Sequence, residues 1–221
     1  MHREQEKKDN VKTMRRIVTF DNVATNGYFA GPDGGLEWVV QDDEVYRTAT
    51  KSNPDIDTVL FGRRTYELFE GFWPHAVDDS PAAPDPHGSG RRSQTIRAQA
   101  VWLSETAKLV FSRTRKDVTW KNSRLIHELD PAKIETMKRQ PGKDMIVFGS
   151  GSIVSQLTQH GLIDEYVFVV SPILLGSGRP LLSGVSGTFR LDLLEAKKFQ
   201  SGNVLLRYAP GIGFAGTRTT N

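Results

Sequence analysis

The chain has 221 residues, of which 38% are hydrophobic and 25% are charged, and its formal net charge at pH 7 is +3. This composition is typical of a soluble globular protein of one large domain or two small ones, and the small charge suits an anionic ligand better than nucleic acid. There is no cysteine, which excludes disulfides, thiolate metal sites and a cysteine nucleophile, and which fits a reducing cytoplasm.

The two ends of the chain are predicted to lie outside the folded domain. Residues 1–13 are highly charged and lack the apolar region of a signal peptide, which predicts a disordered arm. Residues 211–221 are rich in Gly and Thr, which predicts a flexible tail. Residues 14–210 are expected to form a single domain. No run of about 18 apolar residues occurs, so neither a transmembrane helix nor a membrane partner is expected.

The first half of the domain alternates short apolar runs with helical patterns. A β-branched run predicts a strand, a Gly-rich loop follows it, and a helix with an acidic start comes next. A second apolar strand ends at a glycine that opens another helix, and a segment rich in Pro, Gly, Ser and Asp is interpreted as an insertion. In chain order the predictions are strand 16–20, loop 22–35, helix 42–52, strand 57–61, helix 63–70 and insertion 72–92.

The second half continues the alternation and ends in strands without helices between them. A helix begins with Pro131 at its first position, and Gly161 ends the next helix. The predictions are strands 108–112 and 118–120, helix 131–139, strand 144–148, helix 150–159, strand 164–171, loop 171–180, and strands 189–194 and 204–208. Strands that alternate with helices predict a mainly parallel α/β sheet covered by helices, and the last strands predict an antiparallel end.

The stretch 145–154 carries the most informative motif, in which an apolar strand meets a Gly-Ser-Gly-Ser turn and a helix start. Gly149 and Gly151 allow a ligand to approach the backbone, and the helix N-terminus favours an anion such as a nucleotide phosphate. Ser150 and Ser152 add hydroxyl groups. The alternative interpretation is a tight turn without a ligand. Position 154 is Val, so the motif matches neither a Rossmann fingerprint nor a P-loop.

Two further strand ends carry similar groups. Arg63, Arg64 and Thr65 occupy the first helical turn after Gly62, where a cation opposes the helix dipole unless it meets a phosphate. Ser112, Arg113 and Thr114 end the strand 108–112, and Arg can bind a phosphate through a bidentate fork. The alternative is that these arginines point into water. Since ligands of open α/β sheets bind outside the carboxyl ends of the strands, the three motifs are predicted to converge on one dinucleotide.

These motifs, taken in order, resemble those of a known reductase family. The matching segments are 26–34, 62–67, 111–113, 149–152, 164–166 and 172–181, within a region of roughly 14 to 208. The family joins the dihydrofolate reductases to the C-terminal reductase domain of the bifunctional riboflavin-pathway deaminase/reductase, RibD. The resemblance implies a dihydrofolate-reductase-like three-layer α/β/α fold with a mostly parallel sheet, NADPH as hydride donor, and a homodimer with contacts near Tyr166 and Val204.

The resemblance also implies roles for individual residues. The Gly149 turn and the helix that begins at Arg63 are expected to hold the cofactor phosphates, and Arg113 is expected beside the adenosine 2′-phosphate. The cofactor-binding candidates are Val23, Ala24, Gly62, Arg63, Thr65, Ser112, Arg113, Thr114, Gly149, Ser150, Gly151, Ser152 and Ile153.

On the substrate side the resemblance points to a mobile loop over residues 23–38. Asn26 stands where close relatives carry Asp, and Asp43 follows Trp38 at the spacing of the acid of dihydrofolate reductases. Asn26 and Asp43 are therefore the catalytic candidates, although Asp43 has the alternative of a dipole-stabilising carboxylate. The substrate-binding candidates are Trp38, Leu175, Gly176 and Arg179.

The expected function is NADPH-dependent reduction of a small heterocycle, pterin-like or like 5-amino-6-(5-phosphoribosylamino)uracil. The alternative is a member of the same fold that binds a nucleotide or another ligand without turnover. The five histidines show no metal-ligand spacing, so no metal site is expected.

Overall fold

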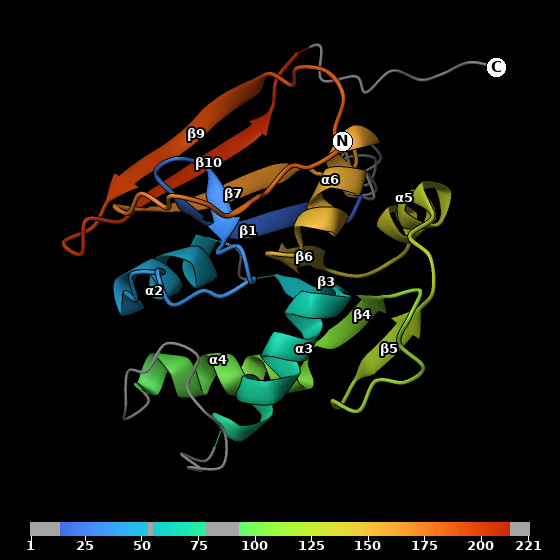
Figure 1. Ribbon diagram of the computed structural model, residues 1–221. Helices are drawn as coiled ribbons and strands as arrows, with labels where there is room; N and C mark the ends of the chain where they lie inside the picture. The colour runs from blue at the N-terminus through green and yellow to red at the C-terminus, as the bar shows by residue number, and fades with distance from the viewer. Residues whose placement is uncertain (1–13, 53–54, 78–92, 213–221) are drawn as a thin grey trace, which may run out of the picture.

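A computed structural model of the chain describes residues 14–52, 55–77 and 93–212 (Figure 1). The predicted N-terminal arm, most of the predicted insertion and nearly all of the predicted tail lie outside these residues. The main sheet has the strand order β5-β4-β3-β6-β1-β7-β10-β9, and β2 and β8 form a separate small pair. The strands are β1 (Ile17–Ala24), β2 (Tyr28–Ala30), β3 (Ile56–Gly62), β4 (Ala107–Phe111), β5 (Ser123–Ile126), β6 (Asp144–Phe148), β7 (Glu165–Ser171), β8 (Arg179–Pro180), β9 (Leu191–Lys198) and β10 (Val204–Pro210).

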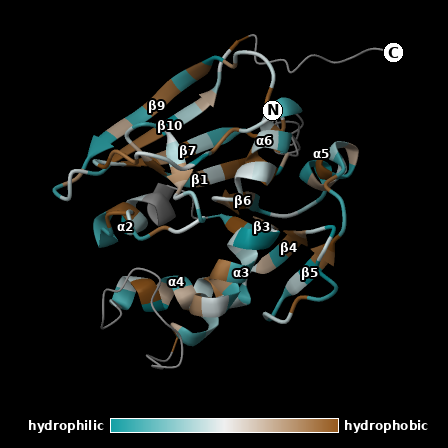
Figure 2. Cartoon of the chain, in the orientation of Figure 1, coloured by the Kyte–Doolittle hydropathy of each residue, from teal (hydrophilic) through white to brown (hydrophobic). Residues whose placement is uncertain are grey.

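Helices cover both faces of the sheet. They are α2 (Asp43–Ser52), α3 (Arg63–Phe72), the 3-10 helix η1 (Trp73–His75), α4 (Gln94–Glu105), α5 (Pro131–Arg139) and α6 (Gly151–Gln159). Buried residues of α5 and α6 share one hydrophobic cluster with the strands, and buried residues of α2, α3 and α4 share the other. Figure 2 shows hydrophobic residues concentrated in the central strands between these two layers. The predicted α/β fold with helices on both faces is confirmed.

The central strands are apolar on both sides because helices cover both sides. In β1, Ile17 belongs to the cluster under α6, and its neighbour Val18 belongs to the cluster under α2 and α3. A parallel sheet buried in this way gives continuous apolar runs instead of alternation. The edge strand β9 has the opposite pattern, since its apolar and charged residues are interspersed along an exposed surface.

The parallel and antiparallel parts of the sheet agree with the sequence-based prediction. Strands β1, β3, β4, β5, β6 and β7 pair in parallel, and β10 pairs antiparallel with both β7 and β9. The register sets Gly62 beside Phe111 and Leu60 beside Val147. The carboxyl ends of β3, β4 and β6 therefore lie next to one another.

Three parts of the secondary-structure prediction are wrong. The loop predicted over 22–35 contains the end of β1 and the whole of β2. Residues 118–120, predicted as a strand, do not join the sheet, and the strand begins later, at β5. The backbone N–H groups of Thr119 and Trp120 donate instead to the side chains of Glu70 and Tyr66 on α3. Helix α4 was not predicted. Ser93 caps it by accepting a hydrogen bond from the Ile96 N–H, a signal that was present in the sequence.

Candidate functional site

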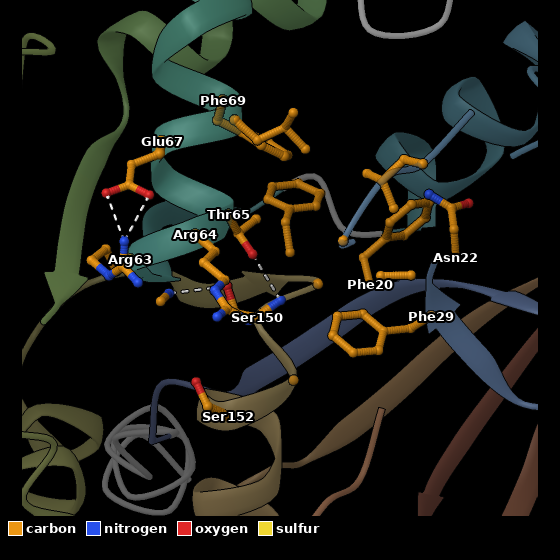
Figure 3. A pocket seen from close by; sticks show the side chains of 18 of the residues that line it. Phe20, Asn22, Phe29, Arg63, Arg64, Thr65, Glu67, Phe69, Ser150 and Ser152 are labelled. Carbon is orange, nitrogen blue, oxygen red and sulfur yellow. Dashed lines mark hydrogen bonds and ion pairs between the residues drawn. The ribbon is translucent and has the colours of Figure 1, made fainter. Parts of the chain in front are cut away.

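The carboxyl ends of β3, β4, β6 and β1 open onto a cleft of about 1260 Å³ (Figure 3). The residues after β3, β4 and β6 all line it, so the three predicted motifs meet at one site. Figure 3 shows Arg63 and Glu67 at one side of the cleft and Phe20, Asn22 and Phe29 at the other. The cleft thus has a charged half around the three turns and an aromatic half beside it. We call these the anion half and the aromatic chamber.

Hydrogen bonds join the turn after β3 to the turn after β6. The backbone N–H of Ser150 donates to Thr65 Oγ1 over 3.1 Å, and the Gly62 N–H donates to Ser150 Oγ over 3.0 Å. A Cβ on Gly62 would lie 3.3 Å from Ile153 Cγ1, so a larger residue would crowd the Ile153 side chain on α6. The hydroxyls of Ser150 and Thr65 therefore fix the relative position of two helix starts.

The turn after β6 uses a left-handed backbone. Gly149 has a φ of 51° and Ser150 a φ of 55°, a conformation that non-glycine residues rarely adopt. A Cβ on Gly151 would lie 2.8 Å from the Leu181 carbonyl oxygen and 2.9 Å from Phe29 Cζ. The first N–H groups of α6, on Gly151 and Ser152, have no intrahelical acceptor and lie at the cleft. They suit an anion at the positive end of the helix dipole.

The turn after β4 is held by its own serine. Ser112 Oγ accepts hydrogen bonds from the N–H groups of Thr114 and Arg115 at 3.2 and 3.0 Å. Arg113 lies on this turn and lines the cleft, and within the described part of the chain its side chain has no ion pair or hydrogen bond. The guanidinium is available to an anionic ligand.

Carboxylates on α3 balance part of this positive charge. Glu67 Oε2 lies 3.2 Å from Arg63 NH1, and Glu67 Oε1 lies 3.7 Å from Arg115 NH1. Arg115 also pairs with Glu70 at 3.2 Å. Burial alone would raise the pKa of Glu70, but hydrogen bonds from Thr119 and Tyr66 and the charge of Arg115 lower it. Arg64, like Arg113, lines the cleft without an ion pair among the described residues.

The aromatic chamber is formed by rings in mutual contact. Phe148 packs against Phe20, Phe69 and Trp102, with ring centroids 5.9, 5.6 and 6.3 Å away. Further rings extend the cluster on both sides through the pairs Phe20–Tyr46, Phe69–Trp73 and Phe72–Trp73. All of these rings line the cleft, as do the amide side chains of Asn22 and Gln99.

Eleven of the candidate residues line this cleft, and eight do not. Those on the cleft are Gly62, Arg63, Thr65, Ser112, Arg113, Thr114, Gly149, Ser150, Gly151, Ser152 and Arg179. Those not on it are Val23, Ala24, Asn26, Trp38, Asp43, Ile153, Leu175 and Gly176. Val23 and Ile153 pack into the core, and Ala24 pairs with Ser171 in the sheet. Trp38 buries its indole nitrogen without a partner among the described residues.

The two catalytic candidates are engaged elsewhere. Asp43 Oδ1 accepts a hydrogen bond from Ser93 Oγ over 3.1 Å, which ties α2 to the start of α4. The Asn26 amide donates to the Leu175 carbonyl oxygen at 2.7 Å and accepts from the Leu175 N–H at 3.3 Å. This reciprocal pair fastens the loop after β1 to the loop after β7.

Sequence reasoning missed the walls of the aromatic chamber. Phe69, Trp73 and Trp102 come from α3, η1 and α4, and nothing in their local pattern separates a cavity wall from a core position. Glu67 was visible inside the Gly62–Glu67 motif but was given no role. Among the described residues there is no group of three or more His, Asp or Glu side chains that could hold a metal ion.

Comparisons with known proteins identify the family. The family model of the RibD C-terminal domain matches residues 15–205. The chain belongs to the RibD C-terminal domain family. A relative in this comparison is the uncharacterized protein YyaP of Bacillus subtilis (strain 168), which is 27% identical over 202 residues, 90% of this chain and 97% of YyaP. No helix among the described residues of this RibD C-terminal domain protein has the length and apolar character needed to span a membrane.

Solved structures place this RibD C-terminal domain among dihydrofolate-reductase-like folds. RibD of Acinetobacter baumannii matches with a TM-score of 0.60 and 17% identity, covering 92% of this chain and 60% of that one. Dihydrofolate reductase of Enterococcus faecalis, solved in complex with NADP(H) and RAB-propyl, matches with a TM-score of 0.55 and 10% identity, covering 88% of this chain and 96% of that one. The dihydrofolate-reductase-like fold predicted from the motifs is confirmed.

Proposed function

We propose that this protein is a reductase that takes a hydride from NADPH and transfers it to a small heterocyclic substrate. The observation that carries the proposal is the convergence of three anion-binding turns on a cleft that continues into an aromatic chamber. A nicotinamide dinucleotide combines phosphates with flat rings, and its acceptor is flat as well. The related fold of Enterococcus faecalis dihydrofolate reductase, solved with NADP(H), supports the same assignment.

The residues of the cleft fit the phosphates of such a cofactor. The first N–H groups of α6, on Gly151 and Ser152, would hold the pyrophosphate at the positive end of the helix dipole. Arg113 and Arg64 would bind the additional 2′-phosphate of NADPH through charge-assisted hydrogen bonds. NADPH would supply the hydride, and the protein would bind and orient both partners and exclude water from the chamber.

Fluorescence or calorimetric titration with NADPH tests the proposal. Arg113→Ala is expected to weaken NADPH binding by roughly 10- to 100-fold, the value of one or two hydrogen bonds to a charged group, and to leave NADH binding unchanged. Arg139→Ala is the matched control, because Arg139 is exposed at the end of α5 and pairs only with Glu135 among the described residues. Absence of binding at millimolar NADPH would overturn the proposal.

A second candidate function is ligand binding without turnover. It is favoured by one observation, that Asp43 lies off the cleft and that the two described carboxylates lining it are already bonded, Asp33 to the Gly35 N–H and Glu67 to Arg63. NADPH oxidation assayed with pterin, pyrimidine and flavin-precursor compounds separates the two candidates. Binding of NADPH without oxidation in any of these assays supports the second.

The proposal includes a cytoplasmic homodimer. Tyr166 is 2% exposed and therefore cannot form the contact itself, and β10, which holds Val204, lies between two strands. The free edge at this end of the sheet is β9, where Leu193 and Leu194 are more than half exposed. We therefore place the contact on β9. Light scattering of the purified protein tests the oligomeric state.

A further inference from the structure

We infer that the acceptor reduced by this protein is an uncharged, flat heteroaromatic compound without a phosphate group. The inference rests on the proposed function, since it assigns the aromatic chamber to the second substrate. It departs from 5-amino-6-(5-phosphoribosylamino)uracil, one of the two kinds of substrate expected from the sequence.

The walls of the chamber select for flat rings. Phe20 and Phe72 are almost fully buried, whereas Phe69, Trp73 and Trp102 keep part of their surface open to the cleft. Aromatic side chains contribute large contact areas and pack best against other rings in stacked or edge-to-face arrangements. The six ring contacts among these residues and their neighbours hold the walls in place before a ligand binds.

Most of the charges of the cleft belong to its anion half. The described charged residues that line the cleft are Asp33, Arg63, Arg64, Glu67, Arg113 and Arg179. Arg63, Arg64, Glu67 and Arg113 belong to the anion half, which the dinucleotide phosphates would fill. An anionic group among the rings of the chamber would lose its hydration without gaining a counter-charge from the described residues, which is unfavourable.

Arg179 is the one described cation that could still meet a phosphate on the acceptor. Its Nε and NH2 groups both donate to the Pro32 carbonyl oxygen, at 3.3 and 3.2 Å. Its NH1 would lie 3.1 Å from a Cβ placed on Gly34. The guanidinium therefore braces the 31–35 loop against β8, and a phosphate would have to compete with these contacts.

Two amides give the chamber its polar character. Neither Asn22 nor Gln99 has a side-chain hydrogen bond within the described part of the chain, and both line the cleft. Figure 3 shows Asn22 beside Phe20 and Phe29, on the side opposite Arg63. An amide both donates and accepts, so it complements the neighbouring N–H and C=O groups of a neutral lactam or imide ring.

Matched ligand pairs test the inference. Binding of riboflavin against flavin mononucleotide, and of uridine against uridine 5′-phosphate, is measured with saturating NADP+ present, so that a ligand phosphate cannot occupy the anion half. We expect at least one uncharged member to bind about tenfold or more tightly than its phosphorylated partner. Gln99→Ala should weaken that binding about tenfold, while Gln94→Ala, an exposed amide on the same helix, should leave it unchanged.

The outcomes separate this inference from the proposed function. Failure of NADP+ itself to bind would refute the proposed function. If NADP+ binds but the phosphorylated members bind more tightly, and Arg179→Ala removes that preference, the proposed function stands and the uncharged acceptor is refuted. If none of these ligands binds at millimolar concentration while NADP+ is bound, the uncharged acceptor is also refuted.

Discussion

Ser150 and Thr65, 85 residues apart in the sequence, are joined by a hydrogen bond from the backbone N–H of Ser150 to the Thr65 hydroxyl. A second hydrogen bond joins the same two turns, because the Ser150 hydroxyl accepts from the Gly62 N–H. The helix starts of α3 and α6 are therefore connected by side chains as well as through β3 and β6. Any ligand that spans both helix starts meets groups with a fixed separation, which lowers the ordering cost of binding.

Thr65→Val is expected to weaken cofactor binding more than it weakens the fold. The substitution keeps the shape of the side chain and leaves the Ser150 N–H without its acceptor. One hydrogen bond is worth about 0.5–1.5 kcal/mol, so NADPH affinity should fall roughly 2- to 12-fold in calorimetry. Thr136→Val is the control, since the hydroxyl of the exposed Thr136 donates to the Ala132 carbonyl oxygen within helix α5. Equal affinities for both variants would contradict a positioning role.

Asp43→Asn is expected to change turnover by less than about tenfold. Asp43 is bonded to Ser93 between α2 and α4 and does not line the cleft. Loss of a general acid typically costs about 100- to 10,000-fold, so a steady-state rate measurement separates the two cases clearly. If Asp43→Asn loses about 100-fold or more in turnover while Thr136→Val keeps the natural rate, Asp43 is the general acid.

The elements that sequence reasoning located well are those with strong local signals. Strand β6 and helix α6 are marked by an apolar run and two glycines, and helix α5 by Pro131 at its start. The error at 118–120 has a tertiary cause. Its β-branched residues suit a strand, but the backbone there bonds to Tyr66 and Glu70 of α3, which no local pattern reveals.

The two halves of the site also differ in whether a local sequence signal marks them. The anion half could be predicted because turns after parallel strands meet at one edge, and its glycines and arginines are conspicuous in the sequence. The aromatic chamber could not, because Phe69, Trp73 and Trp102 converge only through the packing of α3, η1 and α4. Asn26 was interpreted from the sequence as a departure from a catalytic motif. In the structure its amide donates to the Leu175 carbonyl oxygen and accepts from the Leu175 N–H.

Asn26→Asp is expected to loosen the loop after β7. A carboxylate cannot donate to the Leu175 carbonyl oxygen, so the 2.7 Å bond is lost and two oxygens face each other. For this exposed pair the free energy of unfolding should fall by about 1 kcal/mol in urea titrations. Hydrogen exchange over 172–178 should accelerate. Asn26→Ala removes both bonds without adding charge, so its free energy of unfolding should fall by less than that of Asn26→Asp. A larger fall for Asn26→Ala would contradict this account.

Asp21→Asn is expected to stabilise the protein, and by more as the pH rises. Asp21 on β1 is fully buried, and neither carboxylate oxygen has a hydrogen-bond partner among the described residues. Burial raises the pKa of this carboxyl well above its ordinary value. The native state therefore keeps a proton that the unfolded chain releases near pH 4, so the free energy of unfolding falls as the pH rises from about 4 towards the native pKa.

The asparagine variant has no such proton to hold, so its advantage over the natural protein should be smallest at pH 4 and should grow as the pH rises towards 7. Urea titrations at several pH values measure the difference. Asp192→Asn on the exposed strand β9 is the matched control. Parallel pH profiles for the Asp21 variant and the natural protein would mean that the buried carboxyl has a partner that keeps it ionised.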